Sequence, residues 1–256
     1  MGVNVPLYVL LRQMKEQVIP YKELDLPKKE QVTMMFDRIA FRYDLMNRLL
    51  SFGIDMRWRK KIAVALKKEQ PRMILDVATG TADVAIQLAK LKPEKIVGVD
   101  ISQEMLAKGR EKVKEKKLDD LIMLIQADSE QLPFEDNKFD AVTVAFGVRN
   151  FEHLEKGLLE LFRVLKKNGT IIILEFSRPR QFPFKQLFQF YFSSICPMLG
   201  KWITNDKMAY EYLHRSVAEF PDGNDFVAIL KKTGFAETQC TVLTLGISSL
   251  YSGKKH

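Results

Sequence analysis

Cysteine and histidine are scarce in this chain of 256 residues, and their scarcity excludes several kinds of site. The two cysteines, Cys196 and Cys240, have no paired spacing, and the three histidines, His153, His214 and His256, are scattered. A disulfide framework needs several cysteines, and a zinc site needs cysteine or histidine ligands at short, regular intervals. We therefore expect a protein of a reducing compartment, with no disulfide framework and no metal.

Long apolar runs and targeting signals are also lacking. No run approaches the roughly 20 apolar residues that a membrane-spanning helix needs. Residues 4–11 are apolar, but no basic residue precedes them and no small-residue cleavage site follows, so they do not resemble a signal peptide. The expected location is the cytoplasm, and peripheral attachment to the inner face of the membrane is left open.

Basic residues are in excess: 40 Lys and Arg against 32 Asp and Glu give a formal net charge of +8. Such an excess suits nucleic acid and an anionic membrane surface equally well. The composition, 46% apolar and 28% charged, is that of a globular protein able to bury a core. Composition alone does not choose between these partners.

Short apolar runs alternate with helical patterns from residue 73 onward. The predicted strands cover residues 73–78, 95–100, 121–126, 139–146 and 170–175. The predicted helices between them cover residues 82–90, 103–117 and 153–165. This alternation predicts an α/β fold with a mostly parallel sheet and helices on both faces. Two final strands, at 237–243 and 247–251 with a turn at Gly246, are expected to close the sheet.

The segments outside this alternation predict a cap and a lid. Residues 1–68 form an irregular stretch followed by two or three helices, which we interpret as an N-terminal cap on a core at 69–256. Residues 176–205 contain no acidic residue and are rich in aromatics, which predicts a substrate lid at about 178–220. One helical face of this lid carries Leu187, Tyr191, Ile195, Met198 and Trp202, with Lys185 and Lys201 at its ends. That face is either ordinary core or a surface toward a membrane.

Polar residues follow three successive strands, where an open α/β sheet binds its ligand. They are Asp76 near the end of the first strand, with Gly80 and Thr81 after it, Asp100 at the end of the second, and Asp128 and Ser129 after the third. A dinucleotide-binding loop needs glycines where this chain has Ala78, Gly80 and Asp83, which argues against a nicotinamide dehydrogenase. S-adenosylmethionine has no phosphate and needs hydrogen-bond acceptors, so it suits this set. Thr81 and Asp83 could instead simply cap a helix.

Three motifs carry a resemblance to a known family. They are Tyr43-Asp-Leu-Met-Asn47 followed by Ser51 and Trp58, Phe146-Gly-Val-Arg-Asn150, and Arg163-Val-Leu-Lys leading to Leu174-Glu-Phe-Ser177. On these motifs the chain resembles the ubiquinone/menaquinone biosynthesis C-methyltransferase family from about residue 32 to 254. The resemblance implies a Rossmann-like class I methyltransferase that moves a methyl group from S-adenosylmethionine to a ring carbon of a polyprenylated quinol. It also implies cofactor contacts from Thr81, Asp100, Asp128 and Ser129.

The chain departs from the family pattern at three places, one of which is Lys167-Asn168, where the family usually has Pro-Gly in a turn and the change is expected to be harmless. The family usually has histidine where this chain has Asp55, which leaves any role of that histidine in doubt. Its loop is usually richer in glycine than residues 78–82 are here. Because Gly80, Thr81 and Asp83 are kept, we still expect the loop to bind the cofactor.

Methylation of a quinol carbon requires an activated ring, and Arg149 is our candidate for activating it. A phenol with a pKa near 10 is mostly protonated at neutral pH, and a guanidinium in a dry pocket stabilises the phenolate. Asn150 would orient the substrate, and Asp44, Tyr43 or a water molecule would accept the proton. The alternative is a structural ion pair between Arg149 and Glu152 or Glu175.

Three other functions remain as alternatives at this point. A nucleic-acid methyltransferase would show an Asn/Asp-Pro-Pro-aromatic motif or a Pro-Cys nucleophile, and this chain has neither. A nicotinamide dehydrogenase is disfavoured by Asp83, and a non-catalytic scaffold that binds S-adenosylmethionine stays open. The expected partners are the quinol, a transient membrane surface and no nucleic acid. A homodimer, the choice of naphthoquinol or benzoquinol, and the tail length are left undecided.

Overall fold

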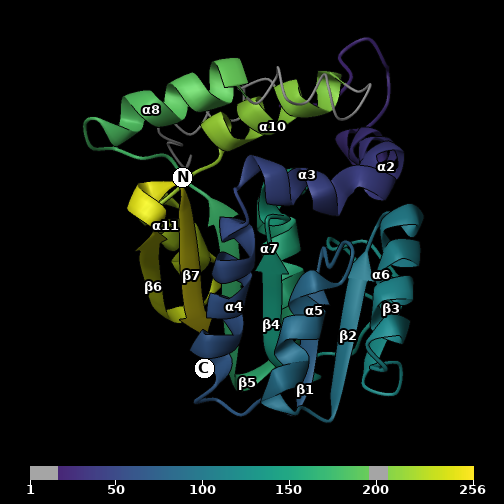
Figure 1. The fold of residues 1–256 in the computed structure, drawn as a ribbon. Helices are drawn as coiled ribbons and strands as arrows, with labels where there is room; N and C mark the ends of the chain where they lie inside the picture. The colour runs from purple at the N-terminus through teal and green to yellow at the C-terminus, as the bar shows by residue number, and fades with distance from the viewer. Residues whose placement is uncertain (1–16, 196–206) are drawn as a thin grey trace, which may run out of the picture.

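The computed structural model describes residues 17–195 and 207–256 as an α/β fold built on one seven-stranded sheet (Figure 1). The strands follow the order β3-β2-β1-β4-β5-β7-β6. Their bounds are β1 Met73–Val77, β2 Lys95–Asp100, β3 Ile122–Gln126, β4 Phe139–Ala145, β5 Leu165–Phe176, β6 Ala236–Leu243 and β7 Ser248–Lys254. The first five strands pair in parallel, and β7 is antiparallel to both of its neighbours. All the parallel strands therefore end at one edge of the sheet, as predicted.

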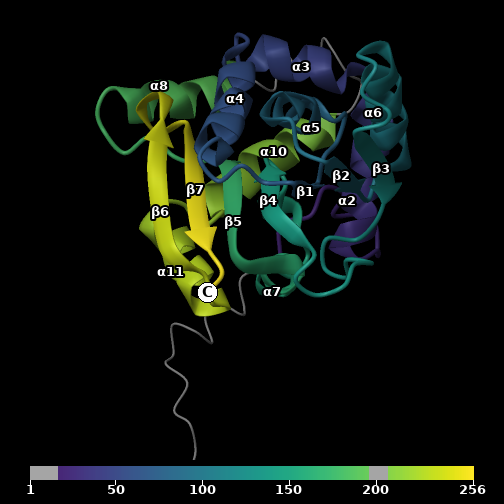
Figure 2. The same cartoon turned by 90° about the horizontal axis from the view of Figure 1, so that it is seen from below.

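Helices cover both faces of the sheet (Figure 2). One face is covered by α4 Ile54–Leu66, α5 Asp83–Leu88 and α6 Gln103–Glu115, and the other by α7 Leu154–Val164 and α11 Asn224–Thr233. The central strands are buried on both sides, which is why they consist of continuous runs of Ile, Leu and Val. The predicted fold class is confirmed.

A cap and a lid lie across the edge where the parallel strands end (Figure 1). The cap consists of α2 Lys28–Ile39, the short turn η1 Ala40–Arg42 and α3 Tyr43–Leu50. The lid consists of α8 Phe184–Phe190, a π-helical turn η4 Tyr191–Ile195 and α10 Lys207–Glu219. One apolar cluster joins them, because residues of α2 and α10 pack together over Met105 of α6. The ligand-binding edge is thus covered by two elements that contact each other.

The structure differs from the sequence prediction mainly at boundaries. Strand β5 begins at Leu165, five residues earlier than predicted, because its first residue already pairs with Phe139 of β4. The expected cap reaches residue 68, but its last helix, α4, packs Ile62 and Leu66 into the core of the sheet. Of the predicted lid face, Met198, Trp202 and Lys201 lie outside the described residues.

Candidate active site

A cleft with several acidic residues in its walls lies where β1, β2, β3 and β4 end. Its walls include residues of all three expected strand ends, together with cap residues above them. The lining residues that carry the argument are Gly80, Asp100, Asp128, Ser129, Glu130 and Asn150. The sheet therefore brings together side chains from three separate stretches of sequence, as the switch-point rule predicts.

The loop after β1 takes an unusual backbone path over this cleft. Ala78, Gly80 and Ala82 all have positive φ, at 52°, 54° and 64°. Such a conformation costs a residue with a Cβ about 1–2 kcal/mol, which explains why glycines are expected at these places. A Cβ added at Gly80 would meet open space, so the loop faces the cleft there. Asp100 holds the loop by accepting the Gly80 N–H at 2.8 Å.

Gly147 makes room for the methyl group of Ala78. A Cβ at position 147 would lie 2.5 Å from the Ala78 Cβ and 3.1 Å from Val144. We expect Gly147→Ala to displace the loop, to lower the melting temperature and to weaken S-adenosylmethionine binding, at a cost of about 1–3 kcal/mol for overpacking. Adding Ala78→Gly removes the clashing methyl group and should restore much of the affinity. Unchanged affinity in calorimetry of Gly147→Ala alone would show that the loop does not depend on this contact.

The acids of the cleft differ in their electrostatic surroundings. Burial raises the pKa of Asp76 to about 6, although the Thr143 and Thr79 hydroxyls donate to it. Burial also raises the pKa of Asp100. Burial acts on Asp128 in the same sense, but a hydrogen bond from Lys29 at 2.7 Å holds its pKa below the ordinary value. Among the described residues, neither Asp100 of the cleft nor Asp76, which lies beside it, has a cationic partner in bonding contact.

These residues fit S-adenosylmethionine. A cleft dominated by carboxylates attracts a ligand with an ammonium and a sulfonium and repels the phosphates of a dinucleotide. Asp76 also lines a small polar recess with Thr79, Thr81 and Arg59, next to the open side of Gly80. This recess would hold the amino-acid end of the cofactor, Asp100 its ribose, and Asp128 and Ser129 its adenine edge. The assignment is the one that the sequence predicts.

An apolar cavity of about 580 Å³ adjoins the cleft on the side of the lid. This volume is in the usual range for small-molecule sites. Its walls come from α2, α3, α4, the end of β5, α8, η4, α10 and the turn before β7. They include Ile39, Met46, Leu50, Trp58, Phe176, Phe184, Leu187, Phe188, Tyr191, Ile195, Leu213 and Ile247. Leu187, Tyr191 and Ile195, the described members of the predicted lid face, all line it. Phe36, Tyr43 and Phe146 line both spaces, so an aromatic boundary separates cleft from cavity.

Arg149 lines the cavity and is ion-paired with Glu175. Its Nη1 donates to Glu175 Oε1 at 2.7 Å and to the Phe146 carbonyl at 2.6 Å. The two side chains are only 7% and 0% exposed. The ion pair that the sequence offered as the alternative to catalysis therefore exists. The Arg149 Nε is buried and has no hydrogen-bond partner among the described residues, so this side chain retains an unused donor.

Asp44 is turned away from the position expected of a proton acceptor. Its carboxylate accepts hydrogen bonds from Thr81 at 2.6 Å and from Lys112 at 2.7 Å, in the contact between cap and core. The cause is helical spacing, because α3 presents Tyr43 and Asn47 to the cavity, whereas Asp44 and Arg48 share its core-facing side. Tyr43 is at the cleft-cavity boundary as expected, and Asp44 is not brought there.

Asp55, the departure from the family pattern, belongs to the same contact between cap and core. It is buried and pairs with both Arg48 and Arg59. Arg48 also pairs with Asp83, and Lys112 bridges Asp83 and Asp44. The network ties α3 and α4 to α5 and α6. Thr81, expected at the cofactor, shares its hydroxyl with this network.

Sequence reasoning missed Lys28, Lys29 and Tyr212. Lys28 is buried, which lowers its pKa to about 8, and its Nζ donates to the carbonyls of Arg149 and Phe151. Lys29 pairs with Asp128 across the cleft. Both lie in the first turn of α2, which begins within the stretch to about residue 30 that the sequence predicts to be irregular. Both lysines contact residues about 100 positions further along the chain. The residues around them in the sequence do not indicate such contacts.

A profile of the ubiE/COQ5 methyltransferase family matches residues 25–255. The chain belongs to this family. The demethylmenaquinone methyltransferase of Bacteroides fragilis is 46% identical over 242 residues, covering 94% of this chain and 98% of that protein. The ubiquinone/menaquinone biosynthesis C-methyltransferase of Geobacter sulfurreducens is 41% identical over 254 residues, covering 98% of each.

Solved structures of methyltransferases share the fold of this family member. A Thermotoga maritima protein, described as an S-adenosylmethionine-dependent methyltransferase, has a TM-score of 0.58 at 20% identity and covers 88% of this chain and 99% of its own. Phosphoethanolamine N-methyltransferase 2 of Haemonchus contortus, solved with S-adenosylmethionine, has a TM-score of 0.52 at 17% identity, covering 72% and 48%. The predictions of an S-adenosylmethionine-dependent methyltransferase and of C-methylation in quinone biosynthesis are confirmed at the level of the family.

Proposed function

We propose that this enzyme methylates a ring carbon of demethylmenaquinol. The observation that carries the proposal is the apolar cavity that adjoins the acidic cleft across an aromatic boundary and contains the buried cation Arg149. An isoprenoid chain needs such an apolar space, and the ring needs a place where cavity and cleft meet. The Bacteroides fragilis relative is named for this substrate. The equivalent benzoquinol is the second candidate, because the Geobacter sulfurreducens relative is named for both quinones.

The side chains of the chain supply orientation and charge. When bound, S-adenosylmethionine supplies an electrophilic methyl group. Arg149 would stabilise the phenolate form of the quinol, because a low dielectric strengthens the attraction between guanidinium and oxyanion. Tyr43, Phe36 and Phe146 would hold the ring at the boundary and exclude water. Asn150, which lines the cleft beside Arg149, would orient the reacting hydroxyl.

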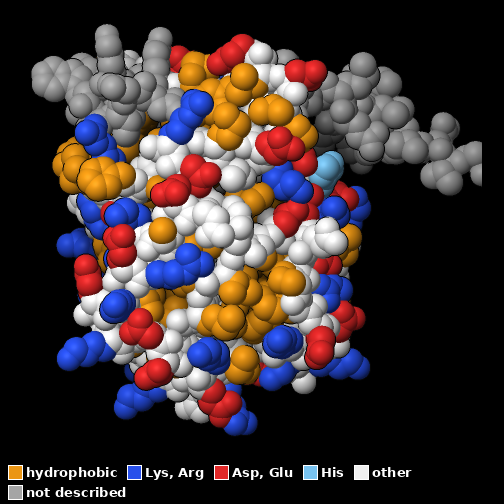
Figure 3. All heavy atoms as spheres, turned by 90° about the vertical axis from the view of Figure 1, so that its right-hand side faces the viewer, with side chains coloured by type: hydrophobic (Ala, Val, Ile, Leu, Met, Phe, Trp, Pro, Cys, Tyr) orange, Lys and Arg blue, Asp and Glu red, His pale blue; other side chains and the backbone are white. Residues whose placement is uncertain are grey.

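A methylation assay with competing acceptors tests this function. Purified protein receives labelled S-adenosylmethionine with a demethylmenaquinol analogue, a benzoquinol analogue or RNA. We expect label on a ring carbon of the naphthoquinol, and transfer to RNA or to a quinol oxygen would refute the proposal. On the face shown in Figure 3, acidic and basic side chains are interspersed, and the described residues form no continuous basic surface there. This face therefore gives no support to a nucleic-acid substrate.

We further propose that the enzyme takes its substrate from an anionic membrane surface. Four cavity-lining side chains are 60–80% exposed and mark the cavity mouth: Phe52, Leu187, Phe190 and Leu245. Lys185 and Arg180 are exposed on the same lid, which has no acidic residue between positions 176 and 205. No helix within the described parts of the chain is long and apolar enough to cross a membrane. A basic, apolar rim suits adsorption to anionic lipid.

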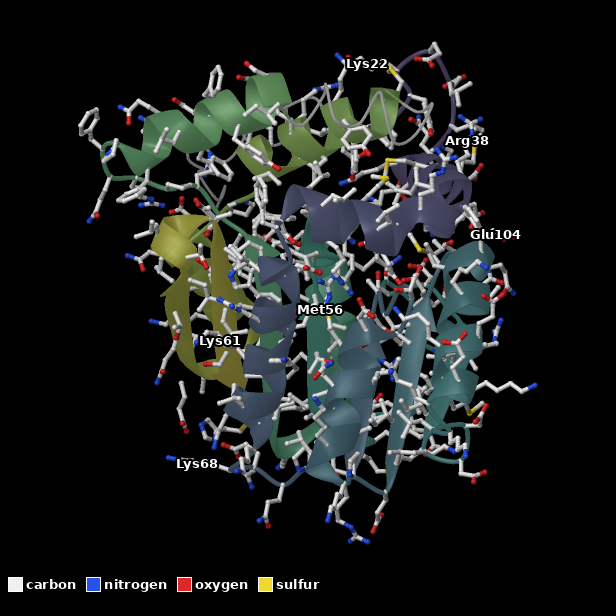
Figure 4. All side chains as sticks on the ribbon, in the orientation of Figure 1. Lys22, Arg38, Met56, Lys61, Lys68 and Glu104 are labelled. Atoms are coloured by element: carbon white, nitrogen blue, oxygen red, sulfur yellow. The ribbon has the colours of Figure 1, made fainter. Side chains whose placement is uncertain are left out.

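Flotation with phosphatidylglycerol vesicles tests this membrane contact. We expect binding at low salt that weakens as salt rises, because screening reduces attraction between exposed charges. Phe190→Glu should weaken binding by about tenfold or more, since inserting one Phe side chain contributes roughly 2 kcal/mol. Val64→Glu is the control, because Val64 is 69% exposed on α4, and Lys61 of this helix and Lys68 just after it point outward, away from the lid (Figure 4). Equal effects of the two substitutions, or no flotation, would exclude this surface.

A further inference from the structure

The short turn η3, Val148–Asn150, is held from three directions. From the cap, Lys28 Nζ donates to the carbonyls of Arg149 at 3.2 Å and Phe151 at 2.8 Å. From the sheet, Glu175 pairs with the Arg149 side chain and accepts its backbone N–H at 3.4 Å. From the lid, the Tyr212 hydroxyl donates to Asn150 Oδ1 at 3.1 Å. Arg149 and Asn150, which are proposed to face the substrate, are thus held in position by the cap, the sheet and the lid.

The carbonyl oxygen of Phe146 links the two members of this pair. It accepts Arg149 Nη1 at 2.6 Å and Asn150 Nδ2 at 3.4 Å. A carbonyl only accepts, so the nitrogen of the Asn150 amide must face Phe146 and its oxygen must face Tyr212. The Phe146 carbonyl therefore sets the flip state of the amide, and the Tyr212 hydroxyl holds its other end by donating to Oδ1. Without that hydroxyl, Oδ1 would lose this partner, and the long contact of 3.4 Å to Phe146 would hold the amide less firmly.

Tyr212 is well placed to act as this donor. It is 2% exposed on α10, and it lines the cavity and packs in the cluster that joins α10 to α2. Burial raises its pKa, so the phenol stays protonated and keeps its donor hydrogen at all physiological pH values. Its hydroxyl is in place only while α10 covers the cavity.

We propose that Tyr212 is a positioning residue for methyl transfer, which holds Asn150 by Oδ1 so that docking of the lid helix α10 completes the Arg149–Asn150 pair. The proposal rests on the function proposed above and adds a dependence on the lid. The lid then does more than enclose the quinol. An enzyme with the lid displaced would bind S-adenosylmethionine but transfer its methyl group slowly.

Tyr212→Phe tests the proposal, because it removes the hydroxyl and keeps the ring. We expect kcat to fall about tenfold, which corresponds to loss of one hydrogen bond of about 1.4 kcal/mol. Calorimetry should give an unchanged Kd for S-adenosylmethionine, and in an Asn150→Ala background Tyr212→Phe should cause no further loss of kcat. Tyr251→Phe is the matched control, because Tyr251 is also buried and its hydroxyl accepts the Gly223 N–H at 2.8 Å, but it lies in the core between the sheet and α7 and α11 and does not line the cavity. It should lower the melting temperature and leave kcat within about twofold.

Two outcomes would overturn the role of Tyr212. One is a kcat equal to that of wild type, and the other is an equal further loss when Asn150 is already alanine. Each kcat is measured with the acceptor that the wild-type enzyme methylates, whether it is the naphthoquinol or another. The choice of acceptor thus tests the proposed function, while the ratio between variants tests Tyr212 separately.

Discussion

Arg149→Ala is expected to lower the free energy of unfolding by about 3–5 kcal/mol, because it leaves Glu175 buried without its partner. The effect should appear as a large fall in melting temperature, before any effect on catalysis is considered. Burial already raises the pKa of Glu175 against the attraction of Arg149. Removing that attraction should raise it further, so the variant should lose less stability at acidic pH, where Glu175 is neutral.

A paired substitution separates this structural role from catalysis. Arg149→Met with Glu175→Gln removes both charges, and replacing a buried ion pair by neutral groups of similar volume is often close to neutral for stability. We expect this double variant to fold and to bind S-adenosylmethionine, with a kcat lower by about two to three orders of magnitude, as when one oxyanion donor is lost. The deficit should shrink as pH approaches the pKa of the quinol. Near wild-type kcat in the folded double variant would show that Arg149 serves only the fold.

The parts of the site that could be predicted from sequence are those on the sheet. Asp76, Asp100 and Asp128 lie at or just after the ends of β1, β2 and β3, and parallel strands end at a common edge, so the strand pattern brings them together. The lid face was predictable for a similar reason, since Leu187 and Tyr191 are four residues apart on one helical turn. Both predictions depend only on the periodicity of apolar residues in strands and helices, and on the rule that ligands bind at the carboxyl ends of parallel strands.

The parts that could not be predicted depend on how separate elements dock. Lys28 and the Arg149 carbonyl are 121 positions apart, and no local pattern distinguishes this buried lysine from its exposed neighbours. Tyr212 meets Asn150 across 62 positions through the packing of α10 on α2. Asp44 could have been placed correctly, because its spacing from Arg48 put both on the helix face opposite the cavity residues. The sequence motif identifies Asp44 as a candidate, but its position around the axis of α3 determines that its carboxylate contacts Thr81 and Lys112.

Asp76→Asn is expected to stabilise the cofactor-free protein at neutral pH and to weaken S-adenosylmethionine binding. Asp76 is 1% exposed, and its two oxygens accept from Thr79 and Thr143, each at 2.7 Å. An asparagine keeps one acceptor, and its amide can donate to the other hydroxyl, which rotates to suit. The substitution therefore removes a buried charge while keeping the local contacts, and a cationic ligand loses that charge.

The raised pKa of Asp76 determines at which pH values Asp76→Asn stabilises the fold. With a pKa of about 6 in the fold and 3.8 when unfolded, Asp76 binds more protons in the folded state between these values. Stability from this group therefore falls as pH rises from about 4 to 6, and its ionisation costs about 3 kcal/mol above that range. Asp76→Asn should thus raise the melting temperature at pH 7.5 and leave it unchanged near pH 4. In the wild type, S-adenosylmethionine affinity should increase as pH rises through 6.

Asp140→Asn provides a control with the opposite sign. Although burial opposes it, hydrogen bonds from Lys166 and the Met73 N–H hold the pKa of Asp140 below its ordinary value. A depressed pKa stabilises the fold above the unfolded pKa, so Asp140→Asn should lower the melting temperature at pH 7.5 and leave cofactor affinity unchanged. Thermal scans and calorimetry across pH 4 to 8 check both variants. A lower melting temperature of Asp76→Asn at pH 7.5, as expected for Asp140→Asn, would show that the Asp76 carboxylate stabilises the fold. That result would contradict a role of Asp76 in binding a cationic cofactor.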